Sequence, residues 1–431
     1  MDKESNSKKR QFRLPPELSN EFKLACEKLS VKPSEKLRDL ITDFLASSNN
    51  NVLNTKPYIF PKKSQKNQYS IGEMYSGPGG IGIAAKKSKL SYKGKKYSFK
   101  HVWATDNHHD TCMTYQQNIP NKKDNDFKVI CEDIHKLDIE SLPYVDGFLY
   151  GFPCNDFSNV GETRGLQGKF GPLYSYGVKY INHHNPKFIF AENVSGLSNA
   201  NSGFAFKKIL SELSKAGKYG YDLNVNLYKF EKYGIPQARH RYIIVGFRKD
   251  LKKSFKVPLP NFINNYNNCR DAISIPKISK DATNNELTNQ SNTVIERLKH
   301  IKPGENAWTA DIPENLRLNV KGAKLSMIYK RLDPKKPAYT ITGSGGGGTH
   351  VYHWKENRAL TNRERARLQT FPDDFEFFGS KESVRRQIGM AVPAQGVQII
   401  LESILMVLAG KEYPSTEPNV NFSKQEILDF E

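Results

Sequence analysis

The sequence predicts an α/β protein whose core is an open, doubly wound sheet. From residue 69 onward short apolar segments recur, and each one ends in a polar or glycine-rich group. Because ligands of open α/β sheets bind at the carboxyl ends of the strands, this layout predicts one site assembled from several strand ends. The length of 431 residues leaves room for two or three domains.

Composition and charge narrow the functional classes. The chain carries 65 Lys and Arg against 45 Asp and Glu, a net charge of +20, which predicts a polyanionic partner. No apolar stretch approaches the roughly 18 residues of a membrane span, and the first residues lack the apolar region of a signal peptide, so we expect no membrane association. The five cysteines are odd in number and form no CxxC pair, which predicts a reducing cytoplasm and no metal site.

The excess charge is concentrated in two segments. Residues 1–68 carry 14 basic and 8 acidic side chains, and residues 248–345 carry 18 basic and 9 acidic ones. Two basic segments that flank a nearly neutral one favour a polyanion-binding role over a uniformly solvated surface.

The sequence pattern predicts a small strand-helix-helix module over residues 1–48 and a linker over residues 49–68. Lys9–Leu14 alternates as a short strand, and two helical patterns follow it. This order resembles the ribbon-helix-helix family, whose paired strands enter the DNA major groove. The resemblance implies base reading by Lys9, Gln11 and Arg13 and a homodimer formed through the module. A helical hairpin that packs on the rest of the chain, or that only pairs two chains, is the alternative.

Three strand ends predict a nucleoside-binding edge. The strand ending at Met74 and Tyr75 enters Ser76–Gly82, whose glycines let a ligand approach backbone N–H groups. The strand 101–105 is followed by Asp106, whose carboxylate can take both hydroxyls of a ribose, and the strand 127–131 is followed by Asp133, an acceptor suited to an adenine amino group. Each aspartate taken singly also fits a loop cap.

Three further segments predict chemistry at the same edge. Cys154 follows the strand 145–150 in a loop, where a thiolate can be exposed and stabilised. Glu192 follows the strand 187–191 and can act as a general acid beside that nucleophile. Arg239 and Arg241 precede the strand 242–247 and can clamp a polar base.

Six motifs across residues 69–409 resemble the DNA (cytosine-5)-methyltransferases, especially the type II modification methylases of bacterial restriction-modification systems. The most specific are the Pro-Cys-Asn around Cys154, the Ala-Glu-Asn-Val around Glu192 and the Gln-Ala-Arg-His-Arg of 237–241. The resemblance implies a doubly wound, S-adenosylmethionine-dependent methyltransferase sheet, with S-adenosylhomocysteine as the product. It implies cofactor binding by Tyr75, Ser76, Gly77, Gly79, Gly80, Asp106, Asn107, Asp133, Ile134, Pro153, Leu173, Ala391 and Val392.

The resemblance also implies a mechanism. A Cys154 thiolate adds to C6 of cytosine, Glu192 donates at N3, and Arg239 or Arg241 neutralises charge near O2. A base stacked in a duplex is inaccessible to this chemistry, so the cytosine is flipped out. The sequence departs from the family at Met390, usually Asn, at Asn107, often aromatic, and at Asn155, more commonly Gln.

The resemblance divides the rest of the chain. It implies a catalytic domain over 69–247, a target-recognition domain over 248–345, a returning part of the catalytic domain over 346–410 and a C-terminal tail over 411–431. The helix 397–408 should pack on the first strands, and Thr361 with Glu364 forms the pattern of a helix-capping box. The glycine-rich run 342–348 fits either backbone close to DNA or a flexible connection.

The implied substrate is double-stranded DNA in a bacterial cytoplasm, close to the nucleoid. A cognate restriction endonuclease is the implied functional partner. Three alternatives stay open: a nicotinamide oxidoreductase built on the glycine loop, a tRNA cytosine-5 methyltransferase, and a DNA-binding autoregulator with a methyltransferase-like core.

Overall fold

A computed structural model describes residues 22–24, 26–27, 67–120, 127–152, 173–196, 203–262, 265–319, 325–346 and 348–420. The chain forms two compact units, 1–59 and 60–431. Only five helical residues of the first unit are described, so the predicted ribbon and its reading positions lie outside the described residues. The following paragraphs concern the second unit.

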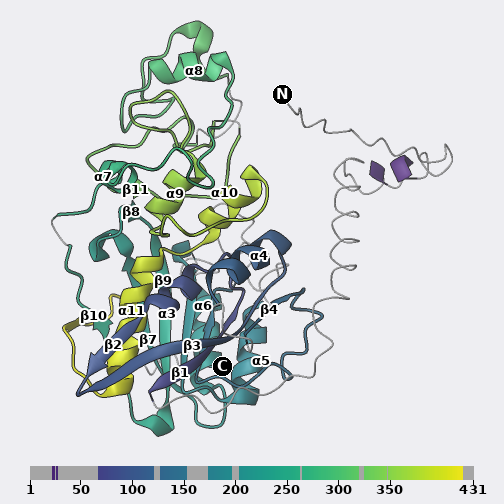
Figure 1. Cartoon of the computed structure of the whole chain (residues 1–431), viewed down its shortest axis with the longest axis vertical. Helices are drawn as coiled ribbons and strands as arrows, with labels where there is room; N and C mark the ends of the chain where they lie inside the picture. The colour runs from purple at the N-terminus through teal and green to yellow at the C-terminus, as the bar shows by residue number, and fades with distance from the viewer. Residues whose placement is uncertain are drawn as a thin grey trace, which may run out of the picture. The chain divides into compact units, whose positions relative to one another are not determined.

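An eight-stranded sheet organises this unit, as predicted (Figure 1). Its order is β2-β3-β1-β5-β6-β9-β7, and β4 also pairs with β3. The central pairs β3·β1, β1·β5 and β5·β6 are parallel, whereas β6·β9 and β9·β7 are antiparallel. The strands are β1 (Gln68–Met74), β2 (Lys89–Tyr92), β3 (Lys95–Asp106), β4 (Lys128–Cys131), β5 (Gly147–Tyr150), β6 (Phe188–Val194), β7 (Tyr221–Lys229) and β9 (His240–Arg248).

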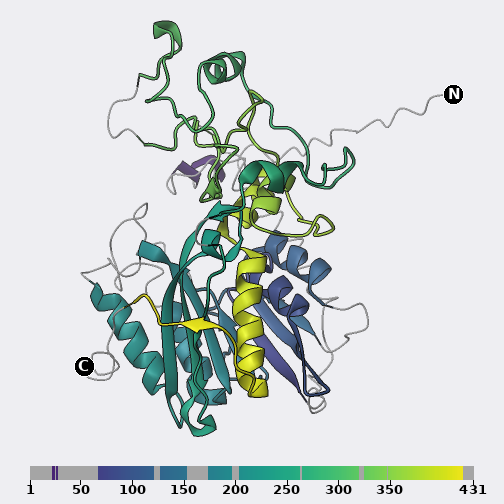
Figure 2. The ribbon, with the colours of Figure 1, turned by 90° about the vertical axis from the view of Figure 1, so that its left-hand side faces the viewer.

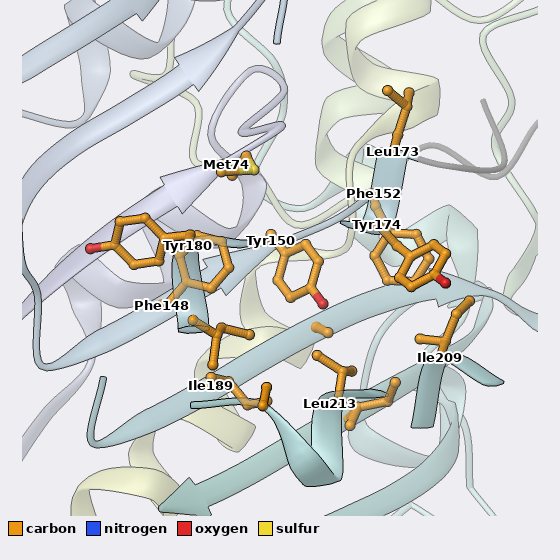
Figure 3. Close-up of a cluster of buried hydrophobic side chains, with 14 of the residues drawn as sticks. Met74, Phe148, Tyr150, Phe152, Leu173, Tyr174, Tyr180, Ile189, Ile209 and Leu213 are labelled. Carbon is orange, nitrogen blue, oxygen red and sulfur yellow. The ribbon is translucent and has the colours of Figure 1, made fainter. Parts of the chain in front are cut away.

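Helices cover both faces of the sheet because its central strands are apolar on both sides. Alternate residues such as Phe148 and Tyr150 pack under α5 (Tyr174–His184) and α6 (Phe204–Lys215), as the cluster in Figure 3 shows. Leu149, between them, faces the opposite core with α3 (Gly80–Lys87) and α11 (Ala394–Ala409). Figure 2 shows α11, in yellow, running along this face. The prediction that the helix 397–408 packs on the first strands is therefore confirmed.

Three strands, β3, β6 and β9, are longer than the sequence predicted, and the difference moves functional side chains. Asp106 is the last residue of β3 rather than the residue after the strand. Glu192 lies within β6 rather than after it, and Arg241 lies within β9 rather than before it. The antiparallel pairing of β6 with β9 continues to Val194 opposite Arg241, so ladder hydrogen bonds extend both strands past their apolar cores. The strands β2 and β7 were not predicted.

The C-terminal segment is also more structured than a tail. Residues 415–416 form β12 (Ser415–Thr416), which pairs antiparallel with β10 (Val257–Pro258). Asn419 exchanges hydrogen bonds with the backbone of Leu227 in β7. Residues 411–420 are thus anchored to the sheet.

A smaller cluster of elements lies beyond the sheet, at the end where α9 and α10 are found in Figure 1. It contains α8 (Asn292–Lys299) and a 3-10 turn, η7 (Glu314–Leu316), around an apolar cluster of their own. The helix α7 (Cys269–Ser274) packs into a separate apolar cluster with α9 and α10. β11 (Ala338–Tyr339) pairs with β8 (Gln237–Ala238), which joins this region to the segment that precedes β9. Two further 3-10 turns, η5 (Phe230–Tyr233) and η6 (Lys249–Leu251), follow β7 and β9.

Two helices lead the chain back to the sheet. α9 (Asn362–Leu368) begins with the predicted capping box between Thr361 and Glu364. α10 (Lys381–Met390) precedes α11, and together Lys381–Ala409 is long and apolar enough to cross a membrane. However, 61 % of its most apolar window is buried in the protein, which identifies α11 as a core helix.

Candidate active site

The strand end that leads to the predicted nucleophile is fixed against β6. Cys154 and Pro153 themselves lie outside the described residues. Asn193 Nδ2 donates a 3.3 Å hydrogen bond to the carbonyl of Phe152, two residues before Cys154. A Cβ placed on Gly151 would lie 3.2 Å from Glu192 Oε2. The chain therefore enters the Cys154 loop directly beside the Glu192 carboxyl.

Glu192 and Arg241 form an ion pair at this edge. Arg241 Nε lies 2.9 Å from Glu192 Oε1, and the two side chains are 12 % and 14 % exposed. Burial raises the pKa of Glu192, while the charges of Arg241 and Arg239 act in the opposite direction. A carboxyl with a raised pKa, held by one arginine, can deliver a proton or a hydrogen bond to a bound base.

The two arginines of the motif have different partners. Arg239 is 1 % exposed, and its two Nη atoms donate to the carbonyls of Ile341 (2.9 Å) and Gly389 (3.0 Å). Arg239 thus ties the segment before β9 to two segments more than 100 residues away. Of the two predicted clamp residues, only Arg241 is paired with the Glu192 carboxyl.

The glycine-rich turn after β1 is held by Asp106, at the end of β3. Gly77 N donates a 3.0 Å hydrogen bond to Oδ2 of Asp106, and His108 N donates one of 3.0 Å to Oδ1. Ser76 N donates to the carbonyl of Thr105 at 2.9 Å. Gly77 and Gly79 have φ of +55° and +98°, which side chains other than glycine rarely adopt. Burial raises the pKa of Asp106, and these N–H donors oppose that rise.

Elements distant in sequence complete this edge. A Cβ on Gly80 would lie 2.8 Å from the carbonyl oxygen of Val392, so the start of α3 contacts the segment of Ala391 and Val392 at backbone distance. Tyr75 Oη donates a 2.8 Å hydrogen bond to the carbonyl of Leu173. Both contacts bring predicted cofactor residues together.

The remaining predicted cofactor residues differ in exposure. The side chain of Asp133 is 47 % exposed, and its Oδ1 accepts from His135 N and Nδ1. These bonds lower the pKa of Asp133, so it is both a loop cap and an available carboxylate. Ile134 is buried, and Asn107 is exposed. Met390, the departure from the family pattern, is 69 % exposed.

Sequence reasoning missed one ionisable group beneath the glycine turn. Glu73 in β1 is 1 % exposed, and Tyr115 Oη donates to its Oε2 at 2.7 Å. Its Oε1 has no hydrogen-bond partner among the described residues, and burial raises the pKa of Glu73 to about 8. The sequence feature that could have revealed Glu73 is a single acidic residue inside an otherwise apolar strand end.

Comparisons with known proteins agree with this geometry. A family model of the C-5 cytosine-specific DNA methylases matches residues 69–406. The chain belongs to this family. It is 53 % identical to the type II methyltransferase M.BbvI of Brevibacillus brevis over 362 residues, which cover 82 % of this chain and 96 % of the relative. It is 39 % identical to M.NgoFVII of Neisseria gonorrhoeae over 80 % of this chain and 89 % of the relative.

A solved structure of similar fold is a putative DNA modification methyltransferase from an E. coli prophage. It has a TM-score of 0.60 and 21 % identity, over 79 % of this methylase and 99 % of that chain. Family membership assigns a methyl donor, S-adenosylmethionine, in place of the nicotinamide alternative. Residues 1–68 precede the matched region.

The glycine edge fits this cofactor. Each oxygen of the Asp106 carboxylate accepts one N–H, which leaves lone pairs for two ribose hydroxyls. Among the residues that the structure describes, no heavy atom lies within 4 Å of the position that a Cβ on Gly77 would occupy, so a ligand can approach that backbone.

Proposed function

We propose that this methylase modifies C5 of a cytosine in a short duplex sequence, with Cys154 as nucleophile, Glu192 as general acid and Arg241 as the cation that orients Glu192. One observation carries the assignment: the Glu192–Arg241 pair adjoins the strand end that enters the Cys154 loop. Arg239 acts as a positioning residue, because both of its Nη atoms donate to backbone carbonyls.

Methylation at C5 requires that a nucleophile of the enzyme first adds to the cytosine ring. C5 of cytosine is too electron-poor to attack a methyl sulfonium, and addition of a thiolate at C6 makes C5 a carbon nucleophile. Glu192 stabilises the charge that then develops on the ring by donating at N3, and burial, which raises the pKa of Glu192, favours the protonated carboxyl that this donation requires. Once C5 has taken up the methyl group, a solvent base removes the C5 proton. The electrons of that C–H bond form the C5–C6 double bond and expel the Cys154 thiolate, and N3 returns its proton to Glu192.

S-adenosylmethionine supplies the methyl group. Asp106 would hold the ribose and Asp133 the adenine amino group, while the backbone of Ser76–Gly80 would approach the rest of the cofactor. Tyr75 and Leu173, joined by their hydrogen bond, would close one side of the pocket together with Pro153. Asn107 and Ile134 would flank the adenine, and Ala391 and Val392 would close the pocket over α3.

We also propose how the protein approaches DNA. The segment 248–345, with 18 basic and 9 acidic residues, would be the target-recognition domain, and 69–247 with 346–410 would form the catalytic domain. The cytosine would be flipped out of the duplex into the site. Residues 1–48 would add a second DNA contact and a homodimer interface.

The similarity to type II methyltransferases supports a cellular role. Methylation would protect DNA from a cognate restriction endonuclease, a functional partner that need not bind the enzyme. The enzyme would work in the cytoplasm, at the nucleoid.

Trapping of a covalent adduct tests the nucleophile. The full chain, incubated with S-adenosylmethionine and duplex DNA that carries 5-fluorocytosine, should give a denaturation-resistant protein–DNA adduct, because the fluorine blocks loss of the C5 substituent. Cys154→Ala should give no adduct and no methylation while it still binds duplex. Cys131→Ala, at an exposed cysteine, is the matched control and should behave as the wild type. An adduct with Cys154→Ala would refute the assignment.

A further inference from the structure

Three arginines on one turn of α9 have very different surroundings. Arg363, Arg365 and Arg367 are 0 %, 1 % and 8 % exposed. A buried guanidinium is stable when its N–H groups meet acceptors, and costly when they do not. The three residues thus provide an internal comparison.

Arg363 and Arg367 are fully engaged. Arg363 donates to the carbonyls of Thr283, Pro372 and Phe375 and to the Thr283 hydroxyl. Arg367 forms a two-point ion pair with Asp373, with distances of 2.8 and 2.6 Å, and donates to the carbonyl of Ile273. Both residues stabilise the fold directly.

Arg365 lacks such partners. Its two contacts with described residues are long, 3.4 Å to the carbonyl of Thr342 and 3.5 Å to His350 Nδ1, and its Nε has no partner among these residues. Within the described part of the chain no carboxylate forms an ion pair with Arg365. Burial and the nearby charge of Arg385 lower its pKa to about 10, so Arg365 still carries its charge at neutral pH.

The neighbours of Arg365 add positive charge. Arg385 Nε contacts the carbonyl of Gly343 at 3.4 Å, and its Nη2 pairs at 3.0 Å with Glu382, whose side chain is 81 % exposed. Glu364 is committed to Arg358 through two hydrogen bonds of 2.8 and 2.7 Å. Burial and the two arginines lower the pKa of His350 to about 4, so His350 is neutral at pH 7.

The glycine-rich loop covers this cluster closely. Gly343 lies against the backbone of Arg386 and Gly345 against the guanidinium of Arg385, so a Cβ at either position would crowd α10. Thr342, Ser344 and Gly346 are exposed on the outer side. Two guanidinium groups therefore contact the inner carbonyls of a thin loop whose outer side faces solvent.

We propose that the positive charges of Arg365 and Arg385 attract a backbone phosphate of the substrate duplex to the solvent side of the loop 342–346, whose backbone lies directly over the two guanidinium groups. The fold tolerates a buried, incompletely paired cation, and the substrate is a polyanion whose phosphates are attracted by this uncompensated positive charge. Because Gly343 and Gly345 carry no side chains, the loop lies directly on Arg385 and Arg386, and only its backbone separates the two guanidinium groups from the solvent side. This inference rests on one part of the proposed function, namely that duplex DNA is the substrate.

Arg365→Met distinguishes this role from a structural one. Binding of a fluorescent duplex that the wild type methylates is measured by anisotropy from 50 to 300 mM KCl, with methylation of that duplex as a separate check of the proposed function. The variant should bind about tenfold more weakly at low salt, and its slope of log K against log [salt] should fall by about 0.9, the value for one phosphate contact. Arg365→Lys should retain the slope.

Thermal unfolding of the same proteins provides the structural readout. Arg365→Met should unfold at or above the wild-type temperature, because it removes a poorly paired buried charge, whereas Arg363→Met, the matched control, should unfold lower. An unchanged salt slope, or a loss of stability in Arg365→Met equal to that of Arg363→Met, would overturn the proposal. Stabilisation of the wild type by inorganic phosphate with unchanged duplex binding in Arg365→Met would overturn DNA as the ligand.

Discussion

Replacing Glu73 by Gln should remove a pH dependence of stability that the fold creates. Glu73 is buried beneath the glycine turn, and Tyr115 donates to one of its oxygens while the other has no partner in the part of the chain that the structure describes. Burial is the largest cause of its raised pKa, and the nearby Asp106 adds to it. Gln is an isostere that can accept from Tyr115 but cannot ionise.

The sign and size of the effect follow from the pKa. The folded-state pKa is about 8 against an ordinary value of 4.5, so the folded protein keeps a proton that the unfolded chain releases. This contribution to stability is complete below pH 4.5 and is lost as pH rises through 8. One pH unit corresponds to about 1.4 kcal/mol, which gives a loss of about 2 kcal/mol between pH 6 and pH 8. At roughly 2 °C per kcal/mol, the melting temperature should fall by about 4 °C from this group.

Thermal unfolding at pH 6, 7 and 8, at constant ionic strength and scan rate, measures the effect. The melting temperature of Glu73→Gln, relative to that of the wild type, should increase as the pH rises from 6 to 8. Glu314→Gln, at an exposed position in η7, is the matched control and should follow the wild type. Parallel curves for the wild type and Glu73→Gln would show that Glu73 does not hold a proton in the folded protein.

Two further predictions concern the contacts that join the sheet to the returning segment. Gly389→Ala should destabilise the protein by about 2 kcal/mol or more, because a Cβ there would collide with the backbone of Thr342 and Gly343; an unchanged denaturation midpoint would contradict this packing. Arg239→Met should lower the melting temperature because the carbonyls of Ile341 and Gly389 lose their donors, at about 1 to 3 kcal/mol each, and Arg239→Lys should rescue only part of the loss. Equal stability of Arg239→Met and the wild type would assign Arg239 no positioning role.

Much of the fold could be predicted from local patterns. The functional residues occur along the chain at the ends of successive strands, first the glycine turn, then Asp106, Glu192 and the arginines. This order could be predicted because each apolar segment ends in a polar group. The capping box at Thr361 and the packing of the helix 397–408 were also predicted, because capping and apolar periodicity are local properties. Family membership then followed from the motifs that these segments carry.

Strand lengths and arginine roles could not be predicted in this way. Glu192 and Arg241 became strand residues because β6 and β9 pair beyond their apolar centres, which depends on the partner strand. Arg239 and Arg241 are indistinguishable in a sequence motif, yet one binds distant carbonyls and the other a carboxylate. Likewise, nothing in the sequence separates Arg365 from Arg363 and Arg367.

The sequence by itself therefore determined the family, the reaction class and the residue types at the site, since these depend on short motifs and on charge. Only the tertiary structure decided which charged groups are neutralised and which are not. Desolvation and pairing depend on segments more than 100 residues apart that meet in space, as Arg239 does with Ile341 and Gly389. The buried Glu73 and Arg365 are consequences of that assembly.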